Sequence, residues 1–184
     1  LLTIPQAQPL ARLVRAQVAS LQHILTVPEL AATTEHGAFP ALQSDDLALL
    51  QYTSGSTGTP KGVMLSHAHL LANLRIMGQA VELTATDVFV SWLPLYHDMG
   101  LIGAWLGSLY YACPLVLLSP LAFLARPARW LWTIHQHQGT LSAGPNFAYE
   151  LCLKKITEDD VVGLDLRSWR CAFNGAETVS AATI

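Results

Sequence analysis

Residues 52–62 read YTSGSTGTPKG, a run that combines hydroxyl side chains, glycines and a single lysine. Glycines allow backbone N–H groups to turn inward around an anion, and serine and threonine hydroxyls add further donors. Lys61 supplies a mobile positive charge at the end of the run. These residue types in this order predict a loop that binds a chain of phosphates.

Two other interpretations of this loop have less support. A flexible linker is usually longer and poor in lysine, whereas this run lies between two apolar segments, 47–52 and 62–65, that we expect to be buried strands. A Walker A loop carries Ser or Thr after its lysine and then opens a helix. Here Lys61 is followed by Gly62 and a strand. The sequence therefore predicts a phosphate loop of another kind.

Strands and helices alternate along the rest of the chain. Apolar runs predict strands at 1–4, 23–27, 47–52, 62–65, 88–93, 114–119, 140–144 and 169–173. Helices are expected at 9–21, 67–81, 99–112, 127–138 and 147–156, with Ser66 and Asn146 as N-caps of the second and the last. Segments 28–46 and 157–160 are expected to be loops. The alternation predicts an α/β fold, a layered sheet covered by helices on both faces.

Four polar or glycine-rich loops follow predicted strands, at 53–61, 94–100, 144–146 and 174–177. In open α/β sheets, ligands bind outside the carboxyl ends of the strands. We therefore expect these four loops to converge on one site.

The composition limits the class of protein. The 184 residues are 52% hydrophobic and only 12% charged, where a typical domain carries about 25% charged residues. Such a surface is expected to be covered by something else. The net charge of −3 gives no basic footprint for nucleic acid. Three widely spaced cysteines indicate reduced thiols of a cytoplasmic protein, and the two His-x-His pairs, at 67–69 and 135–137, lack a third ligand at metal spacing.

A membrane-spanning segment is not expected. The stretch 99–125 has no charged residue, but its glycines and prolines divide it into a buried helix and a strand. The N-terminus has no basic region followed by an apolar one, so it is not a signal peptide. It also does not begin with Met, which fits a chain that starts within a longer protein.

The longest motif carries a resemblance to a known family. YTSGSTGTPKGVMLSH at 52–67 resembles the phosphate-loop signature of the adenylate-forming (AMP-binding) superfamily, which includes acyl-CoA synthetases and peptide-synthetase adenylation domains. SWLPLYHDMGLIG, SPLAFLARPARWLWTI, SAGPNFAYELC and FNGAE, which begin at residues 91, 119, 142 and 173, resemble fatty acyl-AMP ligases more narrowly. The resemblance covers essentially the whole chain. It implies that ATP and a fatty acid form an acyl-AMP and pyrophosphate, after which the acyl group passes to a thiol.

The resemblance also assigns roles to residues. It implies that the β- and γ-phosphates of ATP bind Thr53, Ser54, Gly55, Ser56, Thr57, Gly58 and Lys61, with Thr57 near Mg²⁺. Lys61 and His97 are the implied catalytic residues, His97 standing beside the acyl carboxylate and the α-phosphate. The implied acyl pocket includes Gly144, Pro145 and Asn146, and the implied adenine site is Asn174, Gly175, Ala176 and Glu177. Oriented donors and a lysine would reduce the repulsion between the carboxylate and the triphosphate.

Some roles stay open at this point. Asp98 either orients His97 or caps the helix that follows, and we expect the cap. Phe147 and Tyr149 either line the acyl pocket or belong to the core. Thr178 stands where the family usually has proline after the glutamate, which is expected to loosen that turn.

The resemblance implies a part of a larger enzyme. The sequence does not contain the family's aromatic-Gly-x-x-Glu motif, its ribose-binding aspartate, its hinge or its small C-terminal domain with a catalytic lysine. Residues 1–184 are therefore expected to be the central part of an adenylation domain, incomplete at both ends. Missing parts of the parent chain would cover the apolar surface. We expect the isolated chain not to complete adenylation.

Several functions remain open on sequence alone. A fatty acyl-AMP ligase would transfer its product to the phosphopantetheine thiol of an acyl carrier protein, and a fatty acyl-CoA ligase would use coenzyme A. An amino-acid adenylation domain would usually carry an aspartate in its pocket, and none is evident in SAGPNFAY. A non-catalytic module of the same fold would have no need of the complete phosphate loop.

Overall fold

The computed structural model describes residues 1–33, 37–38, 40–53 and 60–183. The chain forms two compact units, Leu1–Leu42 and Gln43–Ile184, and each is described by itself. In the part of the chain that is described, no helix is both long and apolar enough to cross a membrane.

The first unit is a small β-α-β arrangement, as the sequence predicts. β1 (Leu2–Thr3) and β2 (Leu25–Thr26) pair in parallel, and η1 (Pro5–Ala7) and α1 (Gln8–Gln17) connect them. α2 (Val27–Ala31) lies in a segment expected to be a loop. The Glu29 carboxylate accepts hydrogen bonds from the Thr26 backbone N–H at 2.6 Å and from its hydroxyl at 2.7 Å. This Thr-x-x-Glu spacing is a helix-start signal that the sequence interpretation missed.

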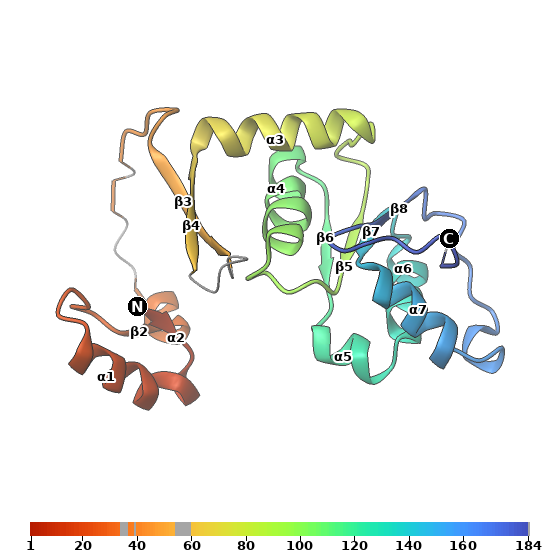
Figure 1. Cartoon of the computed structure of the whole chain (residues 1–184), viewed down its shortest axis with the longest axis horizontal. Helices are drawn as coiled ribbons and strands as arrows, with labels where there is room; N and C mark the ends of the chain where they lie inside the picture. The colour runs from red at the N-terminus through yellow and green to blue at the C-terminus, as the bar shows by residue number, and fades with distance from the viewer. Residues whose placement is uncertain (34–36, 39, 54–59, 184) are drawn as a thin grey trace. The chain divides into compact units, whose positions relative to one another are not determined.

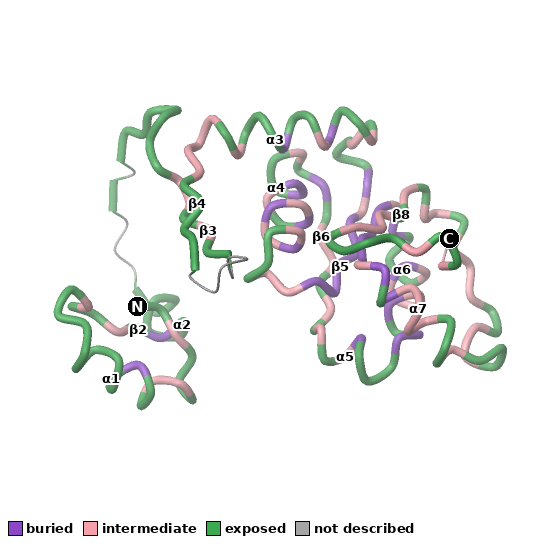
Figure 2. Tube along the Cα trace, viewed as in Figure 1, coloured by how far each residue is buried: buried purple, intermediate pink, exposed green. Residues whose placement is uncertain are grey.

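The second unit begins with a hairpin around the predicted phosphate loop. β3 (Leu47–Thr53) and β4 (Lys61–Ser66) are antiparallel, and Thr53 pairs with Lys61 at the loop end. The expectation that these strands are buried is wrong, because most of their residues are exposed (Figure 2). The two strands pair only with each other among the described residues, and neither joins the parallel sheet. The apolar residues of these strands therefore indicated strand structure correctly but did not indicate burial.

Helix α3 (His67–Ala80) follows the hairpin and begins at the predicted cap. The Ser66 hydroxyl accepts from the His69 backbone N–H at 3.3 Å, while the His69 Nδ1 atom accepts from the Ser66 N–H at 3.2 Å. This reciprocal pair satisfies two backbone donors at the helix start. It also accounts for one histidine of the first His-x-His pair without a metal.

A four-stranded parallel sheet forms the centre of the second unit (Figure 1). Its strands lie in the order β6 (Leu115–Leu117), β5 (Phe89–Ser91), β7 (Leu141–Gly144) and β8 (Cys171–Asn174). All neighbouring strands are parallel, which confirms the predicted α/β class. The chain builds β6 on one side of β5 and then crosses to β7 on the other.

Helices cover both faces of this sheet. One face meets α3, the π-helix η2 (Met99–Leu106) and α4 (Gly107–Tyr111), where the sequence predicts one continuous helix. The other meets α5 (Pro120–Ala125), α6 (Ala128–His137) and α7 (Asn146–Lys155), and η3 (Asp159–Val161) follows α7. α5 was not predicted. The alternation along β7 separates the two faces: Leu141 and Ala143 face a cavity beside α3, while Ser142 accepts from the Trp130 indole N–H of α6 at 2.7 Å.

The α6 face carries the largest side chains of the core. Trp92 stacks on Phe123 with ring centroids 4.0 Å apart, and Trp130 meets Trp92, Phe123, Tyr149 and Trp169 edge to face. The Tyr149 hydroxyl donates to the Phe173 carbonyl at 2.7 Å, and burial raises the pKa of Tyr149 to about 12. Tyr149 therefore belongs to the core and joins α7 to β8.

Candidate functional site

The carboxyl edge of the parallel sheet carries a topological switch point. Because β5 has β6 on one side and β7 on the other, the connections leaving β5 and β7 run in opposite directions. Such a point opens a crevice between the strand ends, which is where open α/β sheets bind ligands. The predicted loops at 94–100, 144–146 and 174–177 follow β5, β7 and β8 at this edge.

The loop after β5 orients His97. Its Nδ1 atom lies 2.8 Å from Asp98 Oδ1, and that carboxylate also accepts from the Met99 backbone N–H at 2.7 Å. Asp98 therefore caps η2, as predicted, and fixes the imidazole as well. Met99 N–H also lies 3.3 Å from His97 Nδ1, but the shorter bond to the carboxylate is the better one and leaves the Nδ1 proton to Asp98. With Nδ1 engaged, Nε2 is the nitrogen that can meet a ligand.

A glycine is required where this loop returns over the start of η2. A Cβ at Gly100 would overlap the carbonyl oxygen of Pro94. Gly100 thus permits the tight approach that places His97 and Asp98 directly at the beginning of the helix.

The loops after β7 and β8 are bonded to each other. Asn174 donates from its amide to Asn146 Oδ1 at 3.2 Å, and the Phe147 backbone N–H donates to Glu177 Oε1 at 2.6 Å. Asn146 Oδ1 also accepts from the Ser180 N–H at 3.1 Å. The loops that carry the predicted acyl-pocket and adenine residues are therefore hydrogen-bonded to each other.

Asn146 does not cap α7, so that prediction is wrong. The N-cap position is Pro145, and Asn146 is the first helical residue. Its amide nitrogen instead donates to Glu150 Oε1 at 2.9 Å, while its side-chain oxygen accepts hydrogen bonds from Asn174 and Ser180. Tertiary partners have taken the groups that a local cap would use.

Two features of the loop after β8 are typical of a binding site. Asn174 Oδ1 is buried and accepts no hydrogen bond from the residues that the structure describes. A buried acceptor of this kind is costly unless a donor reaches it, and an exocyclic amino group of a purine would be such a donor. Ala176 has a φ of 68°, in the left-handed region that non-glycine residues rarely adopt. Strain of this kind is concentrated at functional sites.

Two adjacent cavities lie on the α3 face of the sheet. One, of about 330 Å³, is lined by residues that include Asn73, Asp98 and Ala176. The other, of about 320 Å³, is lined by apolar residues of α3, η2, α4, β5, β7 and β8. They share the wall residues Met77, Met99 and Gly103. A pocket at the carboxyl edge, mostly apolar but with the polar side chains of Asn73 and Asp98 in its wall, thus borders the fully apolar cavity, and we call it the edge pocket.

The remaining predicted residues lie at other places or outside the described residues. Thr53 and Lys61 are exposed at the loop end of the hairpin, and the Thr53 hydroxyl is 3.5 Å from the Lys61 carbonyl. Ser54, Gly55, Ser56, Thr57 and Gly58 lie outside the described residues. Gly144 is next to the cavity residue Ala143, but its own face packs against Trp92, Trp130 and Ala148.

No cluster of three His, Cys, Asp or Glu side chains that could hold a metal occurs within the described ranges. In the second His-x-His pair, the His135 Nδ1 accepts from the Asp165 backbone N–H at 3.0 Å, which gives it a structural role. The three cysteines are free thiols, and burial raises the pKa of Cys152 to about 11.

Sequence interpretation missed most of the apolar cavity. Its wall comes from residues scattered between Leu74 and Phe173, so no contiguous motif contains them. A weak signal was present: Met99, Gly103, Gly107 and Tyr111 recur every fourth residue and all line the cavity. Small residues at that spacing leave room along one face of a helix.

Comparison with known proteins agrees with this arrangement. The family model described as AMP-binding enzyme matches residues 4–184. The chain is 47% identical, over 145 residues and 79% of its length, to the medium-chain-fatty-acid–[acyl-carrier-protein] ligase TtuA of Teredinibacter turnerae. It also matches a structure from studies of fatty acyl-adenylate ligases of E. coli and L. pneumophila, with a TM-score of 0.88 and 39% identity over 99% of the chain.

A third relative was solved with bound molecules. It is the fatty acyl-adenylate ligase of L. pneumophila in complex with acyl adenylate and pyrophosphate, which matches with a TM-score of 0.79 and 38% identity over 99% of the chain. The chain spans 23% of the length of the TtuA ligase and 33% and 32% of the two solved chains.

Proposed function

Because the chain belongs to the AMP-binding enzyme family, we propose that its protein activates a fatty acid with ATP. A carboxylate oxygen of the acid attacks the α-phosphorus, the bond to the β-phosphate oxygen breaks, and acyl-AMP and pyrophosphate form. The acyl group then passes to the phosphopantetheine thiol of an acyl carrier protein, releasing AMP and a proton. Residues 1–184 would be the central part of the adenylation domain, incomplete at both ends and without the small C-terminal domain.

The pair of adjacent cavities carries this proposal. An apolar tail fits the cavity among α3, η2 and the sheet, and its carboxylate would then reach the edge pocket, which opens beside the His97–Asp98 loop. Burying an apolar tail is favourable in proportion to its area, whereas a charged group there would be costly. No acidic or basic side chain lines the apolar cavity within the described residues. The substrate that it favours is a fatty acid and not an amino acid.

The proposed roles of the polar residues follow from their positions. His97, held by Asp98, would present Nε2 to the carboxylate and the α-phosphate. The adenine ring would lie against Gly175 and Ala176, with its amino group donating to Asn174 Oδ1. Glu177 holds this loop to the start of α7 through the Phe147 N–H. The acyl-pocket role of Gly144, Pro145 and Asn146 stays a prediction beside this cavity.

The phosphate loop would hold the leaving group. Lys61 and the donors of residues 53–58 would bind the β- and γ-phosphates and stabilise the charge that develops there. Mg²⁺ near Thr57 would neutralise phosphate charge when bound, and in such sites the substrate phosphates themselves supply many of its ligands. Oriented donors act most strongly in the charged transition state, so this loop is expected to affect turnover more than affinity.

ATP–pyrophosphate exchange on the full-length native protein tests the proposal. Fatty acids of graded length and a set of amino acids would be supplied in turn. Exchange that depends on a fatty acid is expected. Exchange only with amino acids would place the protein with the peptide-synthetase domains, and no exchange with any acid would favour a non-catalytic module.

The acceptor is tested separately. We expect a fatty acid to become attached to a holo acyl carrier protein, as the name of the TtuA relative indicates for that enzyme. Equal or faster acylation of coenzyme A would identify the protein as a fatty acyl-CoA ligase with the same first half-reaction.

A further inference from the structure

The apolar cavity ends where α4 meets α3. Tyr111, the last residue of α4, lines the cavity together with Gly78 of α3. The ring lies so close to Gly78 that a Cβ there would overlap it. The Tyr111 hydroxyl also donates to the Arg75 carbonyl at 3.3 Å. The ring therefore sits directly on the backbone of α3, in a space that is open only because residue 78 is glycine, and a hydrogen bond joins its hydroxyl to the same helix.

Tyr111 lies at the end of the cavity opposite the edge pocket. The shared residues Met99 and Gly103 come early in η2, and Gly107 and Tyr111 follow at intervals of four along the same face. η2 starts after the carboxyl end of β5, and α4 ends shortly before the amino end of β6, so this face runs from one edge of the sheet to the other. Phe89 and Leu141, which begin their strands, line the deep part of the cavity.

We propose that the Tyr111 ring, seated on Gly78, is the stop that sets the longest acyl chain the cavity accepts. The inference rests on the proposed function, because it takes this cavity to hold the acyl tail. Closely packed interiors do not yield easily to an added methylene, so a fixed aromatic ring ends the available length abruptly. A side chain smaller than Tyr at 111 opens the cavity toward the amino edge of the sheet.

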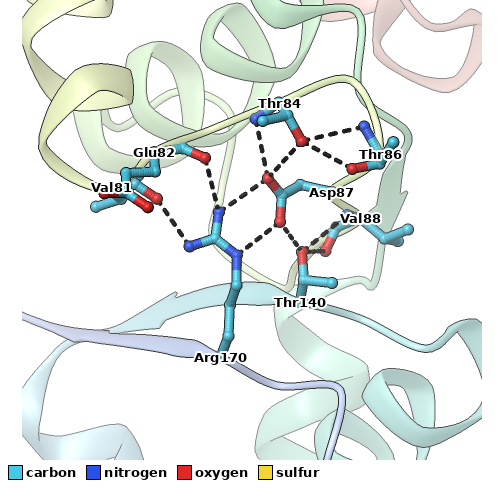
Figure 3. A network of polar contacts seen from close by, with 8 residues as sticks. All are labelled: Val81, Glu82, Thr84, Thr86, Asp87, Val88, Thr140 and Arg170. Carbon is cyan, nitrogen blue, oxygen red and sulfur yellow. Dashed lines mark hydrogen bonds and ion pairs between the residues drawn. The ribbon is translucent and has the colours of Figure 1, made fainter.

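Hydrogen bonds hold the chain immediately after α3, beside this stop. Arg170 donates to the carbonyls of Val81 at 2.7 Å and Glu82 at 3.3 Å, immediately after α3, while its guanidinium pairs with Asp87 (Figure 3). Val81 itself lines the cavity. The segment that follows Gly78 is thus tied to the start of β8, and α3 has little freedom to move away from a longer tail.

The test compares fatty-acid profiles in the full-length native protein. For the wild type and Tyr111→Ala, kcat/KM in ATP–pyrophosphate exchange is measured across saturated fatty acids from short to long. The optimum of Tyr111→Ala is expected to move to longer acids, with about tenfold or more gained for an acid a few methylenes beyond the wild-type limit. Short acids do not reach residue 111, so their kcat/KM is expected to stay close to that of the wild type.

Two control variants isolate the ring. Tyr111→Phe keeps the ring and loses only the hydrogen bond to Arg75, so its optimum is expected to stay at the wild-type length. Leu109→Ala removes an exposed side chain of the same helix that does not line the cavity, and its profile is expected to match the wild type. A shift of the optimum in Leu109→Ala would overturn the assignment to Tyr111.

Gly78→Ala tests the contact between residue 78 and the Tyr111 ring. The added methyl group must displace the ring, and we expect either a shorter optimum or poor folding. Gly78→Ala combined with Tyr111→Ala removes the overlap and is expected to fold and to accept long acids.

The outcomes separate the two proposals. If Tyr111→Ala has the same acyl-length optimum as the wild type, the role of Tyr111 as the stop is refuted, while the proposed function is unaffected. No exchange with any fatty acid in the wild type would overturn the proposed function, and the stop with it.

Discussion

Replacing Arg170 by Leu is expected to weaken the parallel sheet strongly. Arg170 makes two bonds of 2.8 Å to the two carboxylate oxygens of Asp87, a residue that is only 5% exposed (Figure 3). Thr140 and Thr84 donate to the same carboxylate, at 2.7 Å and 2.9 Å. These residues precede β5, β7 and β8, so the network joins the amino ends of three strands.

The magnitude follows from the burial of Asp87. Removing one partner of a buried ion pair costs about 3–5 kcal/mol, because the other charge stays buried without its partner. The Arg170 side chain is 39% exposed, so water reaches part of the pair and reduces its strength. The remaining donors from Thr140 and Thr84 reduce the loss further. We expect Arg170→Leu to lower the free energy of unfolding by about 2–3 kcal/mol.

The effect is expected to depend on pH in a defined direction. The Arg170 guanidinium holds the pKa of Asp87 well below its ordinary range, against the opposing effect of burial. The pair therefore contributes its full stability above the unfolded pKa of about 3.9 and loses it as the pH falls through the folded pKa. The difference between wild type and Arg170→Leu is expected to be constant near neutral pH and to shrink below about pH 4.

Urea unfolding of the full-length native protein, followed by tryptophan fluorescence, measures this difference. Hydrogen exchange of the β5, β7 and β8 amides locates it in the sheet. Arg167→Leu is the matched control: its ion pair with Asp165 is shorter, at 2.6 Å, but its side chain is 91% exposed. We expect no measurable loss there. A loss in Arg167→Leu as large as in Arg170→Leu would refute the argument that burial, and not distance, decides the strength of the pair.

The remaining predictions concern the candidate site. Lys61→Ala is expected to lower the rate of fatty-acid-dependent exchange by about a hundredfold, which is the scale for loss of a donor to developing charge. Lys155→Ala, which removes an exposed lysine at the end of α7, is expected to leave the rate unchanged. Asn174→Ala is expected to raise the KM for ATP and to reduce discrimination against a purine nucleotide that lacks the 6-amino group; unchanged discrimination would argue against contact with adenine. Asn146→Ala is expected to increase hydrogen exchange in 174–180 and raise the KM for ATP without moving the fatty-acid optimum, which a role in the acyl pocket would move.

Features that depend on neighbouring residues could be predicted from the sequence. Ser66 caps α3 as expected because its partner, His69, is three residues away. The strands of the parallel sheet were all located, since their apolar runs are short and bounded by turn residues. Asn146 was misassigned because its side-chain oxygen, the atom that a cap would use, accepts hydrogen bonds from groups 28 and 34 residues away. No local pattern contains those partners.

The candidate site likewise has a part that local sequence motifs predict and a part that depends on residues far apart in the sequence. The phosphate loop and the loops after the strands are contiguous motifs, and the proposed reaction rests on them. The length of the acyl chain depends instead on Gly78 and Tyr111, which lie in different helices and belong to no motif. It follows that relatives with identical motifs can differ in acyl length through substitutions at these two positions. A change at 78 alone is constrained, because any side chain there meets the ring, whereas a smaller residue at 111 relieves that constraint. The two positions are therefore expected to change together, with 111 becoming smaller before 78 becomes larger.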